Sequence, residues 1–297
     1  MNEFYHTPVL LKESLEHLDI KPDGIYVDVT CGEGGHSEAI LQRLNKKGLL
    51  ICLDRDKQIL EVAIKRLKEF KNVFFYNLRF NDIKLALEDR GIKEVNGVIA
   101  DLGISMFHLK NPARGISYTD ELSLDMRLDE NETLTAYEVI NKFKENEIAD
   151  ILYHLGEERE ARKIAREILR HRPIKNAKEL ADLISRVKKE KTKNIHPATK
   201  SFQALRIFVN KELKILESFI PLCADILTEN GKLVIISYHS LEDRIVKWGL
   251  KGLEKEGKGI VCTKKVIVPT EEEIRHNKSA RSAKMRVFKK VSGVKNE

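Results

Sequence analysis

The first hundred residues alternate between short apolar runs and amphipathic segments, and this alternation constrains the fold more than any other feature. Between the runs, SEAILQRLNK and KQILEVAIKRLKEF repeat apolar residues every three or four positions, as helices that cover a sheet do. Strands that alternate with helices predict a parallel, doubly wound α/β sheet. The predicted strands are 25–30 (IYVDVT), 48–53 (GLLICL), 72–76 (NVFFY) and 96–101 (NGVIAD).

The strand pattern stops after Asp101, and helix-like segments without a convincing strand follow from about 134 to 195. A long helix is expected from about 200 to 229, with Pro221 as its break. The α/β pattern then resumes with a strand at 231–238 (GKLVIISY) and a helix in SLEDRIVKWGLKGL, and GIVCTKKVIV and AKMRVFKK close the chain as a hairpin. The sequence therefore predicts a sheet domain from residues 1–108 and 212–297, with a mainly helical domain, residues 109–211, inserted.

Composition excludes several classes of protein. Hydrophobic residues make up 42% of the chain, which is enough for a large core and excludes a disordered chain. Acids interrupt the start, MNEFYHTPVLLKESLEHL, and the apolar runs are too short for a membrane span, so we expect a soluble, unexported, cytoplasmic protein. The four cysteines form no CxxC pair, and no histidine lies at metal spacing from them, so we expect reduced thiols and no metal site.

The basic charge is concentrated in two blocks. Residues 159–200 hold 14 Lys and Arg against 5 Asp and Glu, and residues 275–297 hold 8 against 1, whereas residues 105–158 hold 5 against 12. Such blocks suit a polyanion such as nucleic acid, although each one alone is equally well explained as a solvated surface.

A glycine-rich turn follows the first predicted strand and opens the first predicted helix, in DVTCGEGGHS at 28–37. Gly32, Gly34 and Gly35 allow a tight turn and the close approach of a ligand, and a helix that starts near His36 offers unpaired N–H groups. A turn of this kind in this place predicts a nucleotide-type cofactor site.

Acidic residues end three of the strands beside this turn. Asp54, at the end of the second strand, can take both ribose hydroxyls of an adenosine, and Asp101 ends the fourth strand at the same edge. Each acid also has a structural interpretation: Asp28 as a turn former, Asp54 as a helix cap and Asp101 as an Asx-turn residue. An acid-lined site that lacks G-x-G-x-x-G suits a cationic sulfonium better than a pyrophosphate, which favours S-adenosylmethionine over NAD.

Several long segments together resemble one family, the bacterial small-subunit (16S) ribosomal RNA cytosine-N4 methyltransferases, also called MraW. The resemblance covers nearly the whole chain, in the order of the family's motifs. It rests on HTPVLLKES (6–14), DVTCGEGGHS (28–37), LDRD (53–56), DLGIS (101–105), RGISY (114–118), LDMRLD (124–129), GEEREARKIAREI (156–168), HPATKSFQALRIFVNKEL (196–213), ISYHSLEDRIVK (236–247) and ARSAKMR (280–286).

The resemblance implies a class I methyltransferase sheet with an inserted helical domain that recognises the substrate. It implies methyl transfer from S-adenosylmethionine to N4 of a cytidine in the decoding region of small-subunit rRNA. The cofactor's methionine end would contact Gly34, Gly35 and His36, its ribose Asp54, and its adenine side Phe80 and Asp101. His108 stands where the family has glutamine, within S-M-F-H-L, so we expect altered detail at that contact without loss of binding.

An exocyclic amine needs alignment and a polar acceptor for its N–H more than it needs a strong base. Such acceptors would form a polar wall beside the position of methyl transfer. The candidate catalytic residues for this wall are Asp101 and Ser105 after the fourth strand and Ser237 and His239 after the fifth. Tyr238 could stack on the target base. Equally weighted alternatives make Tyr238 a core aromatic and His239 a helix-start residue, with Glu242-Asp243-Arg244 as a local salt-bridge network.

The expected partner is small-subunit rRNA within the assembled small subunit, and a homodimer is an open alternative. A target base must leave its stack to reach the site, and the inserted domain is the expected wall that holds it. Helical spacing places Arg162, Arg166 and their basic neighbours on one face, which we expect to contact phosphate. The alternative interpretation is an exposed amphipathic helix without a role in RNA binding. The candidate RNA contacts are Arg114, Arg127, Arg162, Arg166, Lys200, Arg206 and Arg281.

Two other classes of function compete with this interpretation. A nicotinamide-dependent dehydrogenase would share the strand, glycine turn and ribose acid, but C-G-E-G-G-H disfavours it. A non-enzymatic RNA-binding assembly factor would use the basic blocks alone, and the intact glycine turn argues against it.

Overall fold

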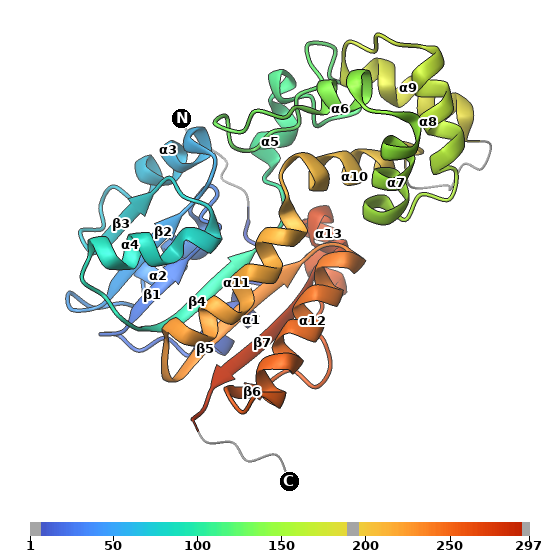
Figure 1. Ribbon diagram of the computed structural model, residues 1–297. Coiled ribbons are helices and arrows are strands. Elements are labelled where there is room, and N and C mark those ends of the chain that lie inside the picture. Colours follow the sequence, from blue (N-terminus) through green and yellow to red (C-terminus); the bar gives the residue numbers. More distant parts are fainter. Residues whose placement is uncertain (1–6, 189–195, 293–297) are drawn as a thin grey trace. The chain divides into compact units, whose positions relative to one another are not determined.

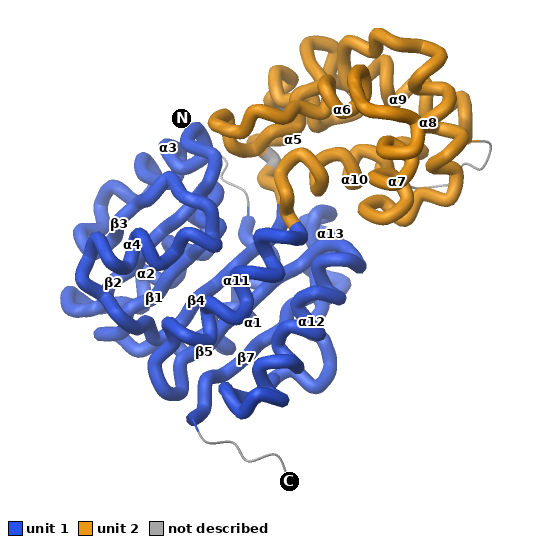
Figure 2. The backbone as a smooth tube through the Cα atoms, in the orientation of Figure 1, with its two compact units in different colours: residues 1–103, 213–297 blue, residues 104–212 orange. Residues whose placement is uncertain are grey.

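The computed structural model describes residues 7–188 and 196–292 (Figure 1). The chain divides into two compact units, residues 1–103 with 213–297 and residues 104–212 (Figure 2). Parts of both predicted basic blocks, residues 189–195 and 293–297, lie outside the described residues.

The first unit is built on one sheet, with the strand order β3-β2-β1-β4-β5-β7-β6 among the described residues. Strands β1 to β5 pair in parallel, and β7 pairs antiparallel with both β5 and β6. This order confirms the predicted doubly wound sheet of a class I methyltransferase, closed by an antiparallel pair. The strands are β1 (Ile25–Asp28), β2 (Leu49–Leu53), β3 (Val73–Tyr76), β4 (Val95–Asp101), β5 (Leu227–Ser237), β6 (Gly259–Val261) and β7 (Lys284–Lys290).

Helices cover both faces of this sheet, because successive strand residues point to opposite sides and both sides are apolar. Val27 belongs to the core cluster that residues of α4, α11 and α12 complete, whereas its neighbour Tyr26 belongs to the cluster completed by α1, α2 and α3. The helices are α1 (Leu11–Leu18), α2 (Gly35–Leu41), α3 (Lys57–Arg66), α4 (Ile83–Asp89), α11 (Glu212–Ile226), α12 (Ser240–Lys255) and α13 (Glu271–His276), with short 3-10 turns η1 (Phe80–Asp82) and η3 (Lys278–Ser282).

The second unit is helical and has its own core. Leu152, Ile164, Ile184 and Leu205 are buried together there, from four different helices. Among the described residues of both units, no helix combines the length and the hydropathy that a membrane span requires. The helical unit contains α5 (Met106–Lys110), η2 (Pro112–Arg114), α6 (Ala136–Lys142), α7 (Glu145–Gly156), α8 (Ala161–Arg170), α9 (Ala177–Val187) and α10 (Thr199–Val209).

The sequence predicts a long helix from about 200 to 229 with a break at Pro221, and the predicted position of that break is wrong. Helix α10 ends at Val209, Asn210 caps it, and Lys211 has a φ of 53°. Helix α11 then begins, and Pro221 lies inside it. The side chain of Asn210 donates to the carbonyl of Met126 at 2.7 Å and accepts from the N–H of Leu128 at 2.8 Å. These tertiary hydrogen bonds hold the chain at the break, and no local pattern around residue 210 reveals them.

Candidate functional site

The predicted glycine turn lies between β1 and α2, at the carboxyl end of the sheet. Gly32 and Gly34 have φ angles of 53° and 83°, which favour glycine. A Cβ on Gly35 would lie 2.4 Å from Cγ of Pro8, and one on Gly34 would lie 3.3 Å from the side chain of Leu67. Close packing of the turn against its own protein therefore adds a reason for glycine that the sequence interpretation did not include.

Asp54 follows β2 and fastens this turn. Its carboxylate accepts hydrogen bonds from the N–H of Gly32 and the N–H of Asp56, both at 2.9 Å. Asp56 caps α3 by accepting from the N–H of Gln58, so the alternative role of Asp54 as the cap of that helix is wrong. The acid predicted to bind ribose is thus held beside the glycine turn.

Asp28 lies buried beneath the turn. Its carboxylate accepts from the hydroxyl of Ser37 at 2.7 Å and from the N–H of Thr30 at 3.2 Å. Burial raises the pKa of Asp28 to about 6, although these hydrogen bonds oppose the rise. The observed role of Asp28 is to support the turn, in line with the alternative interpretation of it as a turn former.

His36, at the start of α2, is buried, and its Nε2 lies 3.1 Å from the carbonyl oxygen of Val9. A carbonyl only accepts, so Nε2 carries the hydrogen. Burial lowers the pKa of His36, which keeps the ring neutral at pH 7. The other ring nitrogen, Nδ1, lies 3.9 Å from the carboxylate of Asp101.

Asp101 ends β4, and its N–H donates to the hydroxyl of Thr30 at 2.6 Å. Its carboxylate is hydrogen-bonded to Tyr238. Burial, followed by the charge of Asp101, raises the pKa of the Tyr238 hydroxyl, so the phenol stays protonated. The ring of Tyr238 packs on Gly103, where a Cβ would lie 2.7 Å away, and against the apolar core of the sheet. This environment favours the core-aromatic alternative for Tyr238.

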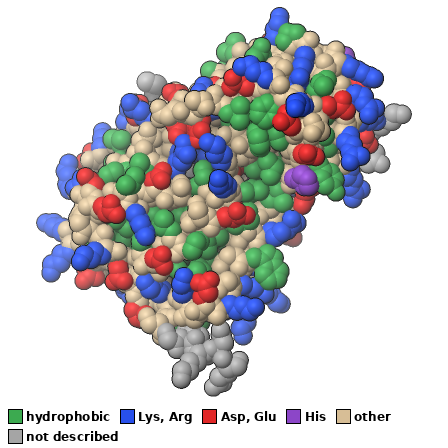
Figure 3. Space-filling view, in the orientation of Figure 1, with side chains coloured by type: hydrophobic (Ala, Val, Ile, Leu, Met, Phe, Trp, Pro, Cys, Tyr) green, Lys and Arg blue, Asp and Glu red, His purple; other side chains and the backbone are tan. Residues whose placement is uncertain are grey.

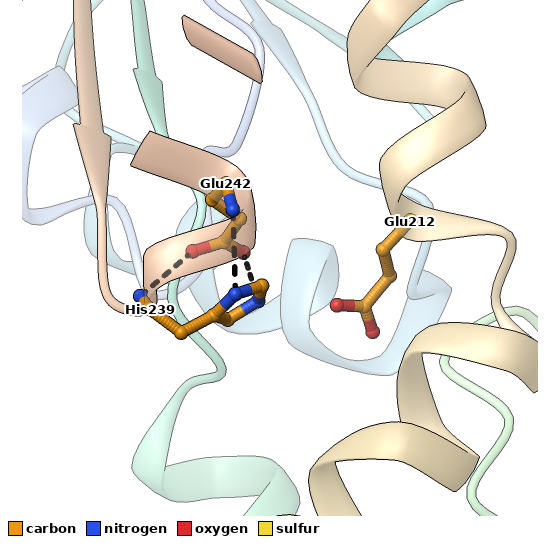
Figure 4. Close-up of side chains that lie close together, drawn as sticks. All are labelled: Glu212, His239 and Glu242. Carbon is orange, nitrogen blue, oxygen red and sulfur yellow. Dashed lines mark hydrogen bonds and ion pairs between the residues drawn. The ribbon is translucent and has the colours of Figure 1, made fainter. Parts of the chain in front are cut away.

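The two candidates after β5 have structural partners. Ser237 is buried, and its hydroxyl donates to the carbonyl of Lys284 at 3.3 Å. His239 caps α12: its Nδ1 accepts from the N–H of Glu242 at 3.3 Å, and its own N–H donates to the carboxylate of Glu242 at 3.3 Å (Figure 4). That carboxylate also accepts from the N–H of Tyr238 at 2.8 Å. The helix-start alternative for His239 is therefore what the structure has, and its catalytic role stays a prediction.

Glu242-Asp243-Arg244 was predicted to form a local salt-bridge network, but Asp243 forms its ion pairs with a distant strand. Asp243 pairs with Arg286 of β7 at 2.7 Å and with Lys284 at 3.4 Å. Phe80 in η1 packs edge to face on Phe219, with the ring centroids 5.0 Å apart.

Ser105 and His108 belong to the helical unit. The hydroxyl of Ser105 caps α5 by accepting from the N–H of Phe107 at 3.0 Å, and His108 is buried. Their predicted contacts with N4 and with the cofactor stay predictions.

Three of the arginines predicted to contact RNA make ion pairs inside the helical unit. Arg114 is only 5% exposed, and its guanidinium pairs with Glu130 at 3.3 Å and donates to the carbonyl of Arg127, so its contact with RNA stays a prediction. Arg127 binds both carboxylate oxygens of Asp125, at 2.7 and 2.8 Å. Arg206 binds Glu212 in the same bidentate way, at 2.9 and 3.0 Å.

The remaining candidates are exposed. Arg162 and Arg166 lie on the outer face of α8, opposite the buried Ile164 and Ile168, so the basic face and the amphipathic helix are both present. Lys and Arg side chains gather over the α8 and α9 end of this unit, with acids among them (Figure 3). Lys200 is exposed in the helical unit, and Arg281 is exposed in η3 of the sheet unit.

Sequence reasoning missed the segment that packs beneath the glycine turn. The N–H of Leu10 donates to the carboxylate of Glu273 in α13 at 2.7 Å, while Val9 accepts from His36 and Pro8 packs on Gly35. The motif HTPVLLKES was the available signal, but a contact across more than 260 residues leaves no local pattern.

Comparisons with known proteins bear on the whole chain. A model of the MraW methylase family matches residues 3–291. A protein of Clostridium botulinum strain 657, named ribosomal RNA small subunit methyltransferase H, is 44% identical over 308 residues, which cover 97% of this chain and 100% of that protein. Proteins of the same name from Clostridioides difficile strain 630 and Caldicellulosiruptor saccharolyticus are each 42% identical, with the same coverage of both chains.

Proposed function

The chain belongs to the MraW methylase family, and we propose that it transfers a methyl group from S-adenosylmethionine to N4 of a cytidine in the decoding region of small-subunit 16S rRNA. The names of its relatives support the substrate. The observation that carries the site assignment is the hydrogen bond of 2.9 Å from Gly32 to Asp54, which joins the glycine turn to the ribose-position acid at the carboxyl edge of the sheet.

The residues at this edge fit S-adenosylmethionine. When bound, the cofactor supplies a methyl group on a cationic sulfonium, and the carboxylates of Asp54 and Asp101 lie on the two strands that flank β1. Gly34, Gly35 and His36 would hold the methionine end, with the neutral ring of His36 oriented by the carbonyl of Val9. Gly32 and Asp54 would hold the ribose end, and Phe80, Asp101 and His108 the adenine side.

The proposed chemical role of this chain is to position the amine and accept its hydrogen bond. The lone pair of N4 is delocalised into the ring, and a carboxylate that accepts an N4–H helps to localise it. Asp101 suits this role because Thr30 holds its backbone and the protonated Tyr238 holds its carboxylate. Ser105, Ser237 and His239 remain candidates for the rest of the polar wall.

We place the RNA contacts on exposed cations, with the assembled small subunit as the substrate. Arg162, Arg166 and Lys200 of the helical unit and Arg281 of the sheet unit are accessible for phosphate contact. The helical unit is proposed to recognise the substrate and to hold the unstacked base. A homodimer remains an alternative assembly.

Methyl transfer from radiolabelled S-adenosylmethionine tests the proposal. Unmodified small subunits and naked 16S rRNA are compared as substrates, with Asp101→Asn and the exposed control Asp23→Asn, and the RNA is digested to nucleosides. We expect label in N4-methylcytidine, more with subunits than with naked rRNA, and loss of transfer in Asp101→Asn alone. Cofactor binding without label in RNA would exclude this substrate. No cofactor binding would favour the assembly factor, and binding of NADH instead would favour the dehydrogenase.

A further inference from the structure

Helix α12 carries a surface that the site described above does not use. Its outward face holds Arg244, Lys247, Trp248, Lys251 and Lys255, here called the basic aromatic face. At 3.6 residues per turn these five positions fall within about 100° of arc. The opposite side of the helix, with Val246, Leu250 and Leu253, is buried against the sheet (Figure 1).

Trp248 is the only tryptophan of the chain, and it is 60% exposed. Single exposed aromatics are common on protein surfaces, but this one lies between cations. The ammonium groups of Lys247 and Lys251 both lie 5.3 Å from the centre of its ring. An aromatic plane flanked by positive charge is the arrangement that binds a nucleobase together with its phosphates.

The acids of α12 have partners other than Lys247 and Lys251. Glu242 accepts from backbone N–H groups at the start of the helix, and Asp243 pairs with Arg286 at 2.7 Å. Glu254 accepts from the N–H of Val261 at 2.8 Å. Lys247 and Lys251 therefore keep their positive charges beside the ring of Trp248, and this arrangement is complementary to a polyanion.

A glycine leaves the space beside Trp248 open. Packing favours glycine at 249, because a Cβ there would lie 2.8 Å from the end of the Ile220 side chain. Gly252 has no such reason, since a Cβ there would meet nothing within 4 Å. Side chains lean toward the start of a helix, so a side chain at 252 would lie over the position one turn earlier, which is Trp248. Glycine inside a helix costs about 1 kcal/mol relative to alanine, and here it keeps the flank of the ring clear.

We propose that the basic aromatic face binds a single-stranded segment of the rRNA substrate, with one base stacked on Trp248 over Gly252. This inference rests on the proposed function for the identity of the RNA. Helix α12 starts directly after β5, and Trp248 lies about 12 Å along its axis from Ser240. The bound segment would therefore flank the target nucleotide, and the face would contribute to substrate affinity and not to the chemical step.

Fluorescence of the full-length protein reports on this contact directly, because Trp248 is its sole tryptophan. Titration with a single-stranded oligoadenylate of about 12 nucleotides is expected to quench the emission saturably, with weaker binding at higher salt. Affinity is measured in parallel from the anisotropy of labelled RNA. Trp248→Ala should weaken binding about tenfold, because stacking of one base contributes an affinity of that order.

Matched variants separate stacking from folding. Gly252→Leu fills the space beside the ring and should weaken binding severalfold, whereas Gly252→Ala should bind as the wild type does. Both replacements favour the helix, so a loss of stability does not explain a loss of binding. Lys247→Glu with Lys251→Glu should reduce affinity and its salt dependence, and Lys12→Glu, on α1, should change neither.

Methyl transfer to small subunits, run with the same variants, distinguishes this inference from the proposed function. A higher KM with little change in kcat for Trp248→Ala supports the proposal that the basic aromatic face binds the substrate RNA. Wild-type transfer with unquenched fluorescence and unchanged affinity of Trp248→Ala overturns the inference but leaves the proposed function standing. Quenching without transfer supports an RNA-binding face and rejects the proposed function. If Trp248→Ala weakens binding to subunits but not to naked RNA, the occupant is a ribosomal protein and the inference is wrong.

Discussion

Replacing Asp28 by asparagine should make the protein progressively more stable than the wild type as the pH rises from about 4 to 7. Burial raises the pKa of Asp28 from 3.8 to about 6; the charge of Asp101 adds to the rise, whereas the hydrogen bonds from Ser37 and Thr30 oppose it. Between these two pH values the folded state keeps a proton that the unfolded state releases. The contribution of this carboxyl to stability is therefore fully present below pH 3.8 and is lost as the pH rises through 6.

The size of the effect follows from the two pKa values. One pH unit corresponds to about 1.4 kcal/mol, so the change from 3.8 to about 6 makes ionisation of the folded protein cost about 3 kcal/mol. Asparagine is neutral throughout this range and resembles the protonated acid in shape. The free energy of unfolding of Asp28→Asn minus that of the wild type should therefore rise by about 3 kcal/mol between pH 4 and 7.

Urea unfolding at several pH values measures this difference. The exposed Asp23 provides the control, because Asp23→Asn makes the same replacement at a carboxyl that folding does not bury. Ser37→Ala removes a donor to the ionised carboxylate and should steepen the pH dependence of the otherwise wild-type protein. A difference between Asp28→Asn and the wild type that stays constant or falls with pH would refute this account of Asp28.

Three further results are expected. Gly35→Ala should destabilise the protein by about 1–3 kcal/mol in urea unfolding, since its Cβ would lie 2.4 Å from Cγ of Pro8, and adding Pro8→Ala should recover part of the loss. Asp243→Asn should cost about 3 kcal/mol near pH 7, because it leaves the largely buried guanidinium of Arg286 unpaired, and the cost should shrink as the pH falls below the usual range of an aspartate pKa. The native protein should react quickly at one thiol with an aromatic disulfide reagent, at Cys262, because the other three cysteines are buried; fast reaction of a second thiol would contradict this.

The fold was predictable because its signals are local. Runs such as GLLICL (48–53) are apolar on both faces, which indicates a strand covered on both sides, and that strand is observed as β2. Asp54 and Asp101 were predicted at the carboxyl edge because parallel strands all end at one edge of a sheet. Membership of a family was also legible, because its motifs are continuous in the sequence.

The ion-pair partners of charged residues were not predictable from the sequence, even where they lie nearby in the chain. Three arginines in family-like motifs read as RNA contacts, yet Arg114 is buried with Glu130, Arg127 binds Asp125, and Arg206 binds Glu212. A sequence shows that a residue is charged, but it does not show whether the folded chain supplies a counter-ion.

The sequence by itself determined the element order, the position of the glycine turn and the family, because periodicity, turn chemistry and contiguous motifs are properties of neighbouring residues. Only the tertiary structure decided which side chains support the site. The bond of Glu273 to Leu10, the orientation of His36 by Val9 and the open space at Gly252 depend on where separate segments meet in the fold. Hydrogen bonds and steric contacts act over a few ångströms of space, and that distance is independent of separation along the chain.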